Sequence, residues 1–207
     1  EQHGTGHAVA QAMPLIPDDH QVLVLYGDVP MVQLDTLARL VAAAGPDAVS
    51  LLSVMLPDPT GYGRVVRDGA GNVVRIVEHK DANTKERAIH ESNTGLMCVP
   101  AGHLRSWLAA LKNDNAQGEY YLTDIIVMAV KSGLKVHAVV APTVTEVLGV
   151  NDKLQLAELG ARAVVPHVLT VRHGQPVAEI AAHTREENAA GMLIGGQGHG
   201  GITERVI

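Results

Sequence analysis

The sequence predicts an α/β fold in which an open, mostly parallel sheet lies between two layers of helices. Residues 22–25 are four consecutive apolar residues between turn-forming residues, as in a strand buried on both faces. Further apolar runs alternate along the chain with segments of helical periodicity. The chain has 207 residues, 46% of them hydrophobic, and therefore suits one domain or one domain with a small appendage.

A helix is expected after this first strand, because apolar residues recur three and four positions apart. Its apolar face comprises Leu34, Leu37, Ala38 and Val41. The next strand is predicted at 48–56. The Gly and Asn content of 68–72 then predicts the turn of a hairpin between 64–67 and 73–77, which interrupts the parallel rhythm.

The same unit continues with a strand at 93–99 and a helix whose apolar face runs from Leu104 to Leu111. Thr123 and Asp124 precede another apolar helical segment and are expected to cap it and to place acid in its first turn. A strand at 136–140 follows. On its own pattern, Asn151 is the expected N-cap of a further helix.

Composition excludes several classes of function. The formal net charge of −6, without a cluster of Lys or Arg, argues against a nucleic-acid-binding protein. No apolar stretch approaches the roughly 20 residues of a membrane span, so no membrane association is expected. Cys98 is the only cysteine and lies in an apolar run, which is consistent with a cytoplasmic location.

Asp28 is the most informative candidate site residue. It follows Tyr26 and Gly27 at the end of the first predicted strand, and open α/β sheets bind ligands at the carboxyl ends of their strands. A carboxylate at such a position holds a divalent metal, caps the following turn, or faces solvent. The tripeptide alone leaves these three alternatives open.

The pattern changes beyond about residue 164. A short apolar strand at 192–194 is followed by a loop with Gly at 195, 196, 198, 200 and 201. Backbone N–H groups of such a loop can bind phosphate oxygens. Gly195, Gly198 and Gly200 are therefore candidate phosphate-loop residues, although a plain flexible turn has the same composition.

Seven motifs, at 1–8, 26–30, 58–64, 76–81, 93–95, 115–124 and 149–151, together resemble one family. They include Gly4-Thr5-Gly6, Tyr26-Gly27-Asp28, Gly61-Tyr62-Gly63 and Glu119-Tyr120-Tyr121. In this order they resemble the uridylyltransferase domain of bacterial N-acetylglucosamine-1-phosphate uridylyltransferases, whose other half is a glucosamine-1-phosphate acetyltransferase. The resemblance covers residues 1 to about 163, which defines a first, partial sugar nucleotidyltransferase domain.

The resemblance implies the Rossmann-like fold of nucleotide-diphospho-sugar transferases. It implies that UTP and N-acetylglucosamine 1-phosphate react to give UDP-N-acetylglucosamine and pyrophosphate. The implied cofactor is Mg²⁺, held by Asp28 and Asn151, which would also be the catalytic residues. The implied substrate-binding residues are Gly63, Glu78 and Asn93 at the sugar phosphate, Gly4 and Thr5 at the uracil and ribose, and Tyr26 and Gly27.

Each of the sugar-phosphate residues also has a purely structural interpretation. Gly63 could serve a turn, Glu78 could form a surface ion pair with Lys80 or Arg75, and Asn93 could hold a loop through bonds to the backbone. The joint occurrence of the motifs in family order favours a common site.

The family's first strand and its Gly-rich phosphate loop precede the position that matches Glu1, so a truncated enzyme of reduced or lost turnover is expected. Residues 164–207 resemble the C-terminal part of a universal stress protein, a βαβ segment, which predicts a chimera. One hypothesis is that 192–194 fills the vacant strand position beside 22–25. The alternative function is then a non-catalytic nucleotide- or sugar-phosphate-binding protein, and an unfilled sheet edge would favour a homo-oligomer.

Overall fold

One sheet organises residues 3–150 and 192–194, the part of the chain described by the computed structural model. Its strands are β1 (Gln21–Tyr26), β2 (Ala48–Met55), β3 (Arg64–Arg67), β4 (Val73–Val77), β5 (Glu91–Pro100), β6 (Lys135–Val140) and β7 (Met192–Ile194). The α-helices are α1 (Thr5–Ala12), α2 (Leu34–Ala43), α3 (Thr84–Arg87), α4 (Ala101–Ala110) and α5 (Ile125–Lys131). Short 3₁₀ helices are η1 (Met13–Leu15), η2 (Leu122–Asp124) and η3 (Val144–Val147). No described helix has the length and apolar content that crossing a membrane requires.

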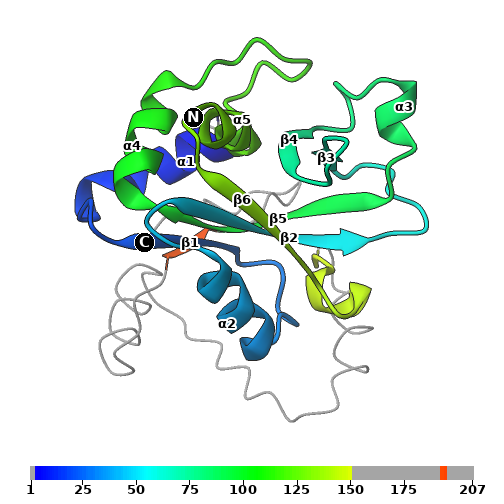
Figure 1. Ribbon diagram of the computed structural model, residues 1–207, viewed down its shortest axis with the longest axis horizontal. Helices are drawn as coiled ribbons and strands as arrows, with labels where there is room; N and C mark the ends of the chain where they lie inside the picture. Colours follow the sequence, from blue (N-terminus) through cyan, green and yellow to red (C-terminus); the bar gives the residue numbers. More distant parts are fainter. Residues whose placement is uncertain (1–2, 151–191, 195–207) are drawn as a thin grey trace.

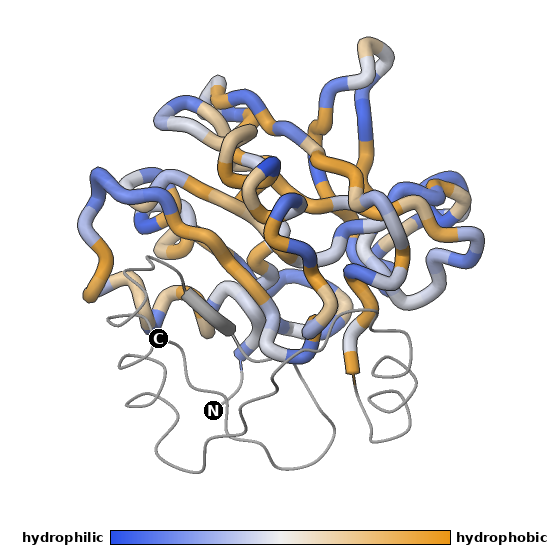
Figure 2. Tube along the Cα trace, turned by 90° about the horizontal axis from the view of Figure 1, so that it is seen from below, coloured by the Kyte–Doolittle hydropathy of each residue, from blue (hydrophilic) through white to orange (hydrophobic). Residues whose placement is uncertain are grey.

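A hydrophobic cluster fills each side of the sheet. On one face Leu40 of α2 is buried in a cluster with Leu52 and Leu96. On the other, α1, α4 and α5 enclose a cluster that includes Val24 and Met97. Figure 1 shows α2 on one side of the strands and α1, α4 and α5 on the other, and Figure 2 shows hydrophilic colour in the outer loops. The predicted three-layer α/β architecture is confirmed.

β5 is the central strand and runs antiparallel to its neighbours. β1 and β2 pair with its two edges, so Cys98 lies between Leu23 and Ser50. Among the described strands, parallel pairing occurs only between β1 and β7 and between β2 and β6. The sheet is therefore mixed rather than mostly parallel. An apolar run indicates that a strand is buried on both faces. A central strand covered by helices is buried in this way whether it runs parallel or antiparallel to its neighbours.

One edge of β5 is shared by two strands. β1 pairs with this edge through residues 97–100. Ser92 pairs with Val54 of β2 on its other edge, so its pairing with Arg64 places β3 on the same edge as β1. β1 and β3 consequently diverge beside residues 93–96. Neighbouring strands that diverge at their ends form the usual ligand-binding position of open α/β sheets.

β7 extends the sheet beyond β1. Their parallel register places Val24 beside Met192, Leu25 beside Leu193 and Tyr26 beside Ile194. The hypothesis that 192–194 lies beside the first strand is confirmed. The loop of Gly195, Gly198 and Gly200, the residue Asn151 with the helix expected after it, and all of the expected βαβ segment except 192–194 lie outside the described residues.

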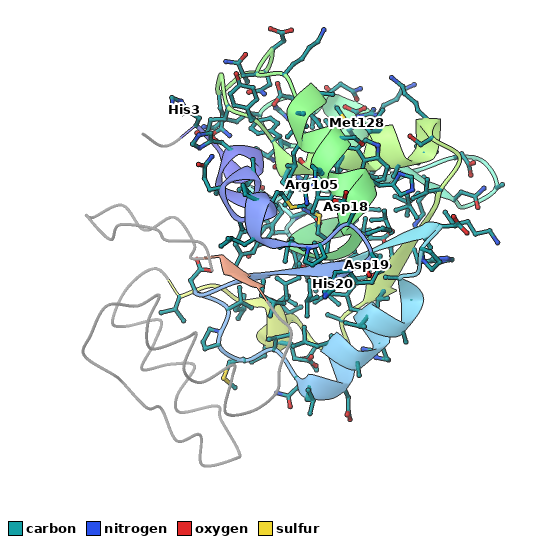
Figure 3. The ribbon with its side chains drawn as sticks, turned by 90° about the vertical axis from the view of Figure 1, so that its left-hand side faces the viewer. His3, Asp18, Asp19, His20, Arg105 and Met128 are labelled. Atoms are coloured by element: carbon teal, nitrogen blue, oxygen red, sulfur yellow. The ribbon has the colours of Figure 1, made fainter. Side chains whose placement is uncertain are left out.

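Arg105 of α4 fixes the connection between α1 and β1. Its Nε donates to Asp18 Oδ1 at 2.8 Å, and its two terminal nitrogens donate to the carbonyl oxygens of Met13 and Ile16 at 2.9 and 2.6 Å. In Figure 3 Arg105 and Asp18 lie close together beside this connection. A single guanidinium thereby satisfies backbone oxygens at the end of α1 and of η1.

The helix α2 forms where predicted, but it buries a different face. Leu34 is 80% exposed and Val41 is 44% exposed, whereas Thr36 and Leu40 are buried. Thr36 Oγ1 donates to the buried Glu146 Oε2 at 2.7 Å, so a hydrogen-bonded polar pair occupies a place where the sequence pattern expects an apolar contact. The expected face of Leu34, Ala38 and Val41 is therefore wrong.

Replacing Leu40 by Ala should lower the free energy of unfolding by about 2–5 kcal/mol, because the fully buried side chain leaves a cavity beneath α2. The matched change Leu34→Ala on the exposed face should alter it by no more than about 0.5 kcal/mol. Urea denaturation of both variants makes the comparison. Equal losses would contradict the observed orientation of α2.

Candidate active site

Gly63, Glu78 and Asn93 lie together where β1 and β3 diverge. The Asn93 N–H donates to the Gly63 carbonyl oxygen at 2.8 Å. A Cβ atom on Gly63 would lie 3.2 Å from Glu78 Oε2, tighter than most real Cβ contacts. The absence of a side chain at Gly63 lets the Glu78 carboxylate approach the backbone that enters β3. The structure thus brings together the three residues predicted at the sugar phosphate.

Thr123 belongs to the same group of side chains through its hydrogen bond to Glu78, and the sequence reasoning missed it. Its Oγ1 donates to Glu78 Oε1 at 2.9 Å. The expectation that Thr123 and Asp124 cap the next helix is wrong, because they lie in η2 and α5 begins at Ile125 without a side-chain cap bond. The sequence did contain one indication that Thr123 belongs to the site, because this residue lies near the end of the motif 115–124.

The Glu78 carboxyl has an environment that favours its neutral form. Burial, the largest cause, raises its pKa. The hydrogen bond from Thr123 opposes this shift, and the neighbouring carboxylates of Asp124 and Asp81 add to it. Burial, and to a lesser extent the negative charge of Asp81, also raises the pKa of the Asp124 carboxyl. Neighbouring carboxyl groups with raised pKa values are typical of functional sites.

The interpretation of Glu78 as one half of a surface ion pair is wrong. Arg75 pairs with Glu86, which also completes the capping box of Asn83 at the start of α3. Lys80 Nζ donates to Gln117 Oε1 at 2.6 Å. Both cations named in that interpretation thus have other partners.

Arg64 anchors the segments that carry Gly63 and Glu78. Its side chain is buried, with one terminal nitrogen donating to the Tyr62 carbonyl oxygen and the other 3.2 Å from His79 Nδ1. Burial lowers its pKa. Because Tyr62 precedes Gly63 and His79 follows Glu78, this guanidinium links the two segments that carry Gly63 and Glu78.

Asn93 contributes an unsatisfied acceptor. Its Oδ1 is buried and has no hydrogen-bond partner within the described part of the chain. A buried oxygen without a donor costs roughly 1–3 kcal/mol. A hydroxyl or N–H group of a ligand would satisfy it, so Asn93 fits the binding role expected for it better than the role of a loop support.

The N-terminus of α1 is bound to the segment that leads to Thr123. The Tyr120 N–H donates to the His3 carbonyl oxygen and the Gly6 N–H to the Tyr120 carbonyl oxygen, both at 2.8 Å. Leu122 N–H donates to Thr5 Oγ1 at 3.0 Å. Gly4 has φ +103°, and a Cβ there would lie 2.8 Å from the Tyr120 oxygen. Gly4 and Thr5 are therefore packed against the backbone that leads to Thr123.

Asp28 lies in the turn that follows β1. The Val29 N–H donates to the Tyr26 carbonyl oxygen at 3.3 Å, a turn that includes Gly27. The Val150 N–H donates to the Asp28 carbonyl oxygen at 2.7 Å, and a Cβ on Gly149 would lie 3.8 Å from Asp28 Oδ2. The carboxylate is thus adjacent to the residues just before Asn151.

The surroundings of Asp28 fit a hard cation that keeps most of its ligands from substrate and water. Within residues 3–150 and 192–194, no group of three or more His, Cys, Asp or Glu side chains could hold a metal ion. Mg²⁺ usually takes only one or two protein carboxylates together with phosphate oxygens and waters. Asp28 supplies such a carboxylate.

Comparison with known proteins shows the family. The family model for nucleotidyl transferases matches residues 1–147, so the chain belongs to the nucleotidyl transferase family. The fold alone is shared with a putative glucose-1-phosphate thymidylyltransferase from Bacillus anthracis. That structure has a TM-score of 0.54 and 18% identity, and the match covers 84% of this chain and 65% of the other.

Within the family, the chain is similar to bifunctional GlmU proteins. It is 58% identical over 159 residues to the protein from Cupriavidus metallidurans, covering 77% of this chain and 35% of that protein. It is 61% identical over 156 residues to the protein from Alkalilimnicola ehrlichii, covering 75% and 34%. The chain therefore spans about a third of the length of these relatives.

Glu78 should make stability depend on pH. Its pKa in the folded state lies above the ordinary value of 4.5, so between these two values the native state holds a proton that the unfolded state has released. Stability relative to a Glu78→Gln variant should therefore fall as pH rises through this window and stay constant above it. Urea denaturation at a series of pH values measures the difference, and a flat profile would contradict the raised pKa.

Proposed function

We propose that this chain transfers UMP from UTP to N-acetylglucosamine 1-phosphate, giving UDP-N-acetylglucosamine and pyrophosphate. The observation that carries the proposal is the assembly of Gly63, Glu78 and Asn93, in which the Asn93 Oδ1 is buried without a donor. Family membership supports nucleotidyl transfer, and the similarity to bifunctional GlmU proteins supports this choice of substrates.

The reaction requires little acid–base catalysis from the protein. An oxygen of the sugar phosphate, already anionic, attacks the α-phosphorus of UTP, and the bond from that phosphorus to the bridging oxygen of pyrophosphate breaks. Alignment of the reactants and compensation of charge on the α-phosphate dominate such a step. Asn93 Oδ1 would accept a hydrogen bond from a hydroxyl or N–H of the sugar. Glu78 and Thr123 would orient the sugar beside Gly63.

Asp28 and Asn151 would hold the Mg²⁺ ion, which when bound supplies positive charge beside the phosphates. The bond from the Val150 N–H to the Asp28 carbonyl oxygen supports this pairing, because it fixes the residue before Asn151 against Asp28. Tyr26 and Gly27 shape the turn that presents the carboxylate. Gly4 and Thr5 would contact the uracil and ribose.

A second function is favoured by β7. Its parallel register puts Ile194 level with Tyr26, so β7 ends at the same edge of the sheet as β1. We therefore retain a phosphate-binding role for Gly195, Gly198 and Gly200, in a nucleotide-binding chimera with or without turnover. The proposed units remain 1–163 and a universal-stress-protein-like 164–207, in a cytoplasmic protein.

Asp28→Asn should reduce pyrophosphate release from UTP and N-acetylglucosamine 1-phosphate by about 100-fold or more. Without the Asp28 carboxylate, the metal that would compensate the charge on the α-phosphate is no longer held. Pyrophosphate is measured with Mg²⁺ present, and Asp35→Asn in the first turn of α2 is the matched control. Asp35→Asn should retain wild-type turnover. Equal turnover in the two variants would overturn the metal role of Asp28.

A wild-type chain that binds Mg²⁺-UTP without releasing pyrophosphate would favour the second function. Calorimetric titration with UTP in the presence and absence of Mg²⁺ distinguishes the two cases. A chain that neither binds UTP nor releases pyrophosphate would overturn both.

Asn93→Leu should separate binding from stability. Replacing an amide whose buried oxygen has no partner by an apolar side chain of similar shape should leave the free energy of unfolding unchanged or raise it. The affinity for N-acetylglucosamine 1-phosphate should fall about tenfold, the equivalent of about 1.4 kcal/mol. Thermal denaturation and calorimetric titration measure the two quantities. A destabilised protein with unchanged affinity would show that Asn93 supports the fold instead.

A further inference from the structure

β5 carries an irregular segment beside the candidate active site. Its pairing with β2 shifts in register between the pairs Leu51–Met97 and Ser53–Asn93, so three residues of β5 face one residue of β2. Thr94 holds this bulge, with Oγ1 donating to the Leu52 carbonyl oxygen at 2.8 Å and accepting from the Leu96 N–H at 3.3 Å. A bulge next to a site commonly redirects side chains.

Gly95 lies at the centre of the bulge, under the ring of Tyr26. It has φ +86°, and a Cβ atom on it would lie 1.9 Å from Tyr26 Cε2 and 2.7 Å from the Tyr26 hydroxyl oxygen. The β1–β5 register, continued two residues past Val24 and Met97, sets Tyr26 opposite Gly95. The aromatic ring therefore occupies the volume in which any other residue at position 95 would place its side chain.

This contact joins the two halves of the candidate site. Tyr26 lies two residues before Asp28, and Gly95 lies two residues after Asn93. Between them, β1 has left the edge of β5 and β3 has not yet joined it. The position of the Asp28 turn relative to Asn93 thus depends on how closely Tyr26 approaches Gly95.

We propose that Gly95 is a positioning residue that acts through Tyr26 to set Asp28 at the correct distance from Asn93. The inference rests on the proposed function, because it assigns Asp28 to the nucleotide and Asn93 to the sugar phosphate. It adds a residue that touches neither substrate. Any side chain at position 95 would push the Tyr26 ring away and displace the turn that follows.

The test is Gly95→Ala, with Gly71→Ala as a matched control. Gly71 has φ +87°, and a Cβ there would meet nothing within 4 Å, so its substitution carries the same backbone cost without the contact. Gly95→Ala should lower kcat for pyrophosphate release roughly 10- to 100-fold, since small misplacements of reacting groups cost that much. The KM for UTP should change far less. Gly71→Ala should retain wild-type kinetics.

A double variant separates the contact from general damage. In a Tyr26→Leu background the ring is gone, so adding Gly95→Ala should cost at most about twofold in kcat. A cost as large as in the wild-type background would overturn the inference, because the methyl group would then act through something other than Tyr26.

A structural readout keeps this test separate from that of the proposed function. Labelling with 3-fluorotyrosine gives signals from four tyrosines, and Tyr26→Phe identifies that of Tyr26. Gly95→Ala should shift this ¹⁹F resonance and Gly71→Ala should not. An unmoved resonance, or a moved one with unchanged kcat, would overturn the role of Gly95. If the wild-type chain has no turnover and binds no UTP, the proposed function fails instead, and the resonance still tests the Tyr26–Gly95 contact.

Discussion

The sharing of one edge of β5 by β1 and β3 is the constraint on which the site depends. A strand edge can satisfy only one neighbour at a time, so β1 must end before β3 can begin. The residues on either side of this change, Asp28 after β1 and Gly63 before β3, are therefore brought near the same stretch of β5. Hydrogen bonds from Asn93 and Thr94 stabilise β5 where its partner changes from β1 to β3. The buried guanidinium of Arg64 fixes the neighbouring loops.

The sequence predicted those features that depend on local pattern. The strand at 22–25, the hairpin around 68–72 and the helix after Leu104 all appear, because apolar periodicity and turn residues act over a few positions. Strand direction in the sheet and the buried face of α2 could not be predicted in the same way. The direction of a strand depends on which distant strand becomes its neighbour. The burial of Thr36 depends on Glu146, a residue far along the chain that accepts its hydrogen bond.

The residues of the candidate site likewise divide into those that the sequence identified and those that only the fold brings into place. The resemblance identified Gly63, Glu78 and Asn93, which the fold brings together. It did not identify the residues that hold them in place, because the local sequence around those residues indicates ordinary secondary structure. Thr123 had the pattern of a helix cap, and its partner Glu78 follows β4, 45 residues earlier in the sequence. Glu78 itself illustrates a cost of the site. Its carboxyl is buried near two other carboxyl groups, an arrangement that packing alone would not favour.

The pairing of β7 with β1 also bears on how the chain folds. It joins a strand near the start of the sequence to one synthesised long after it, which is a contact of very high sequence separation. Loop closure of that length slows folding, and none of the other described strands pairs with this edge of β1 before 192–194 has been synthesised. During that interval another chain with an exposed strand could pair with the open edge. The β1–β7 pair is therefore the last of the described strand pairs for which both members have been synthesised.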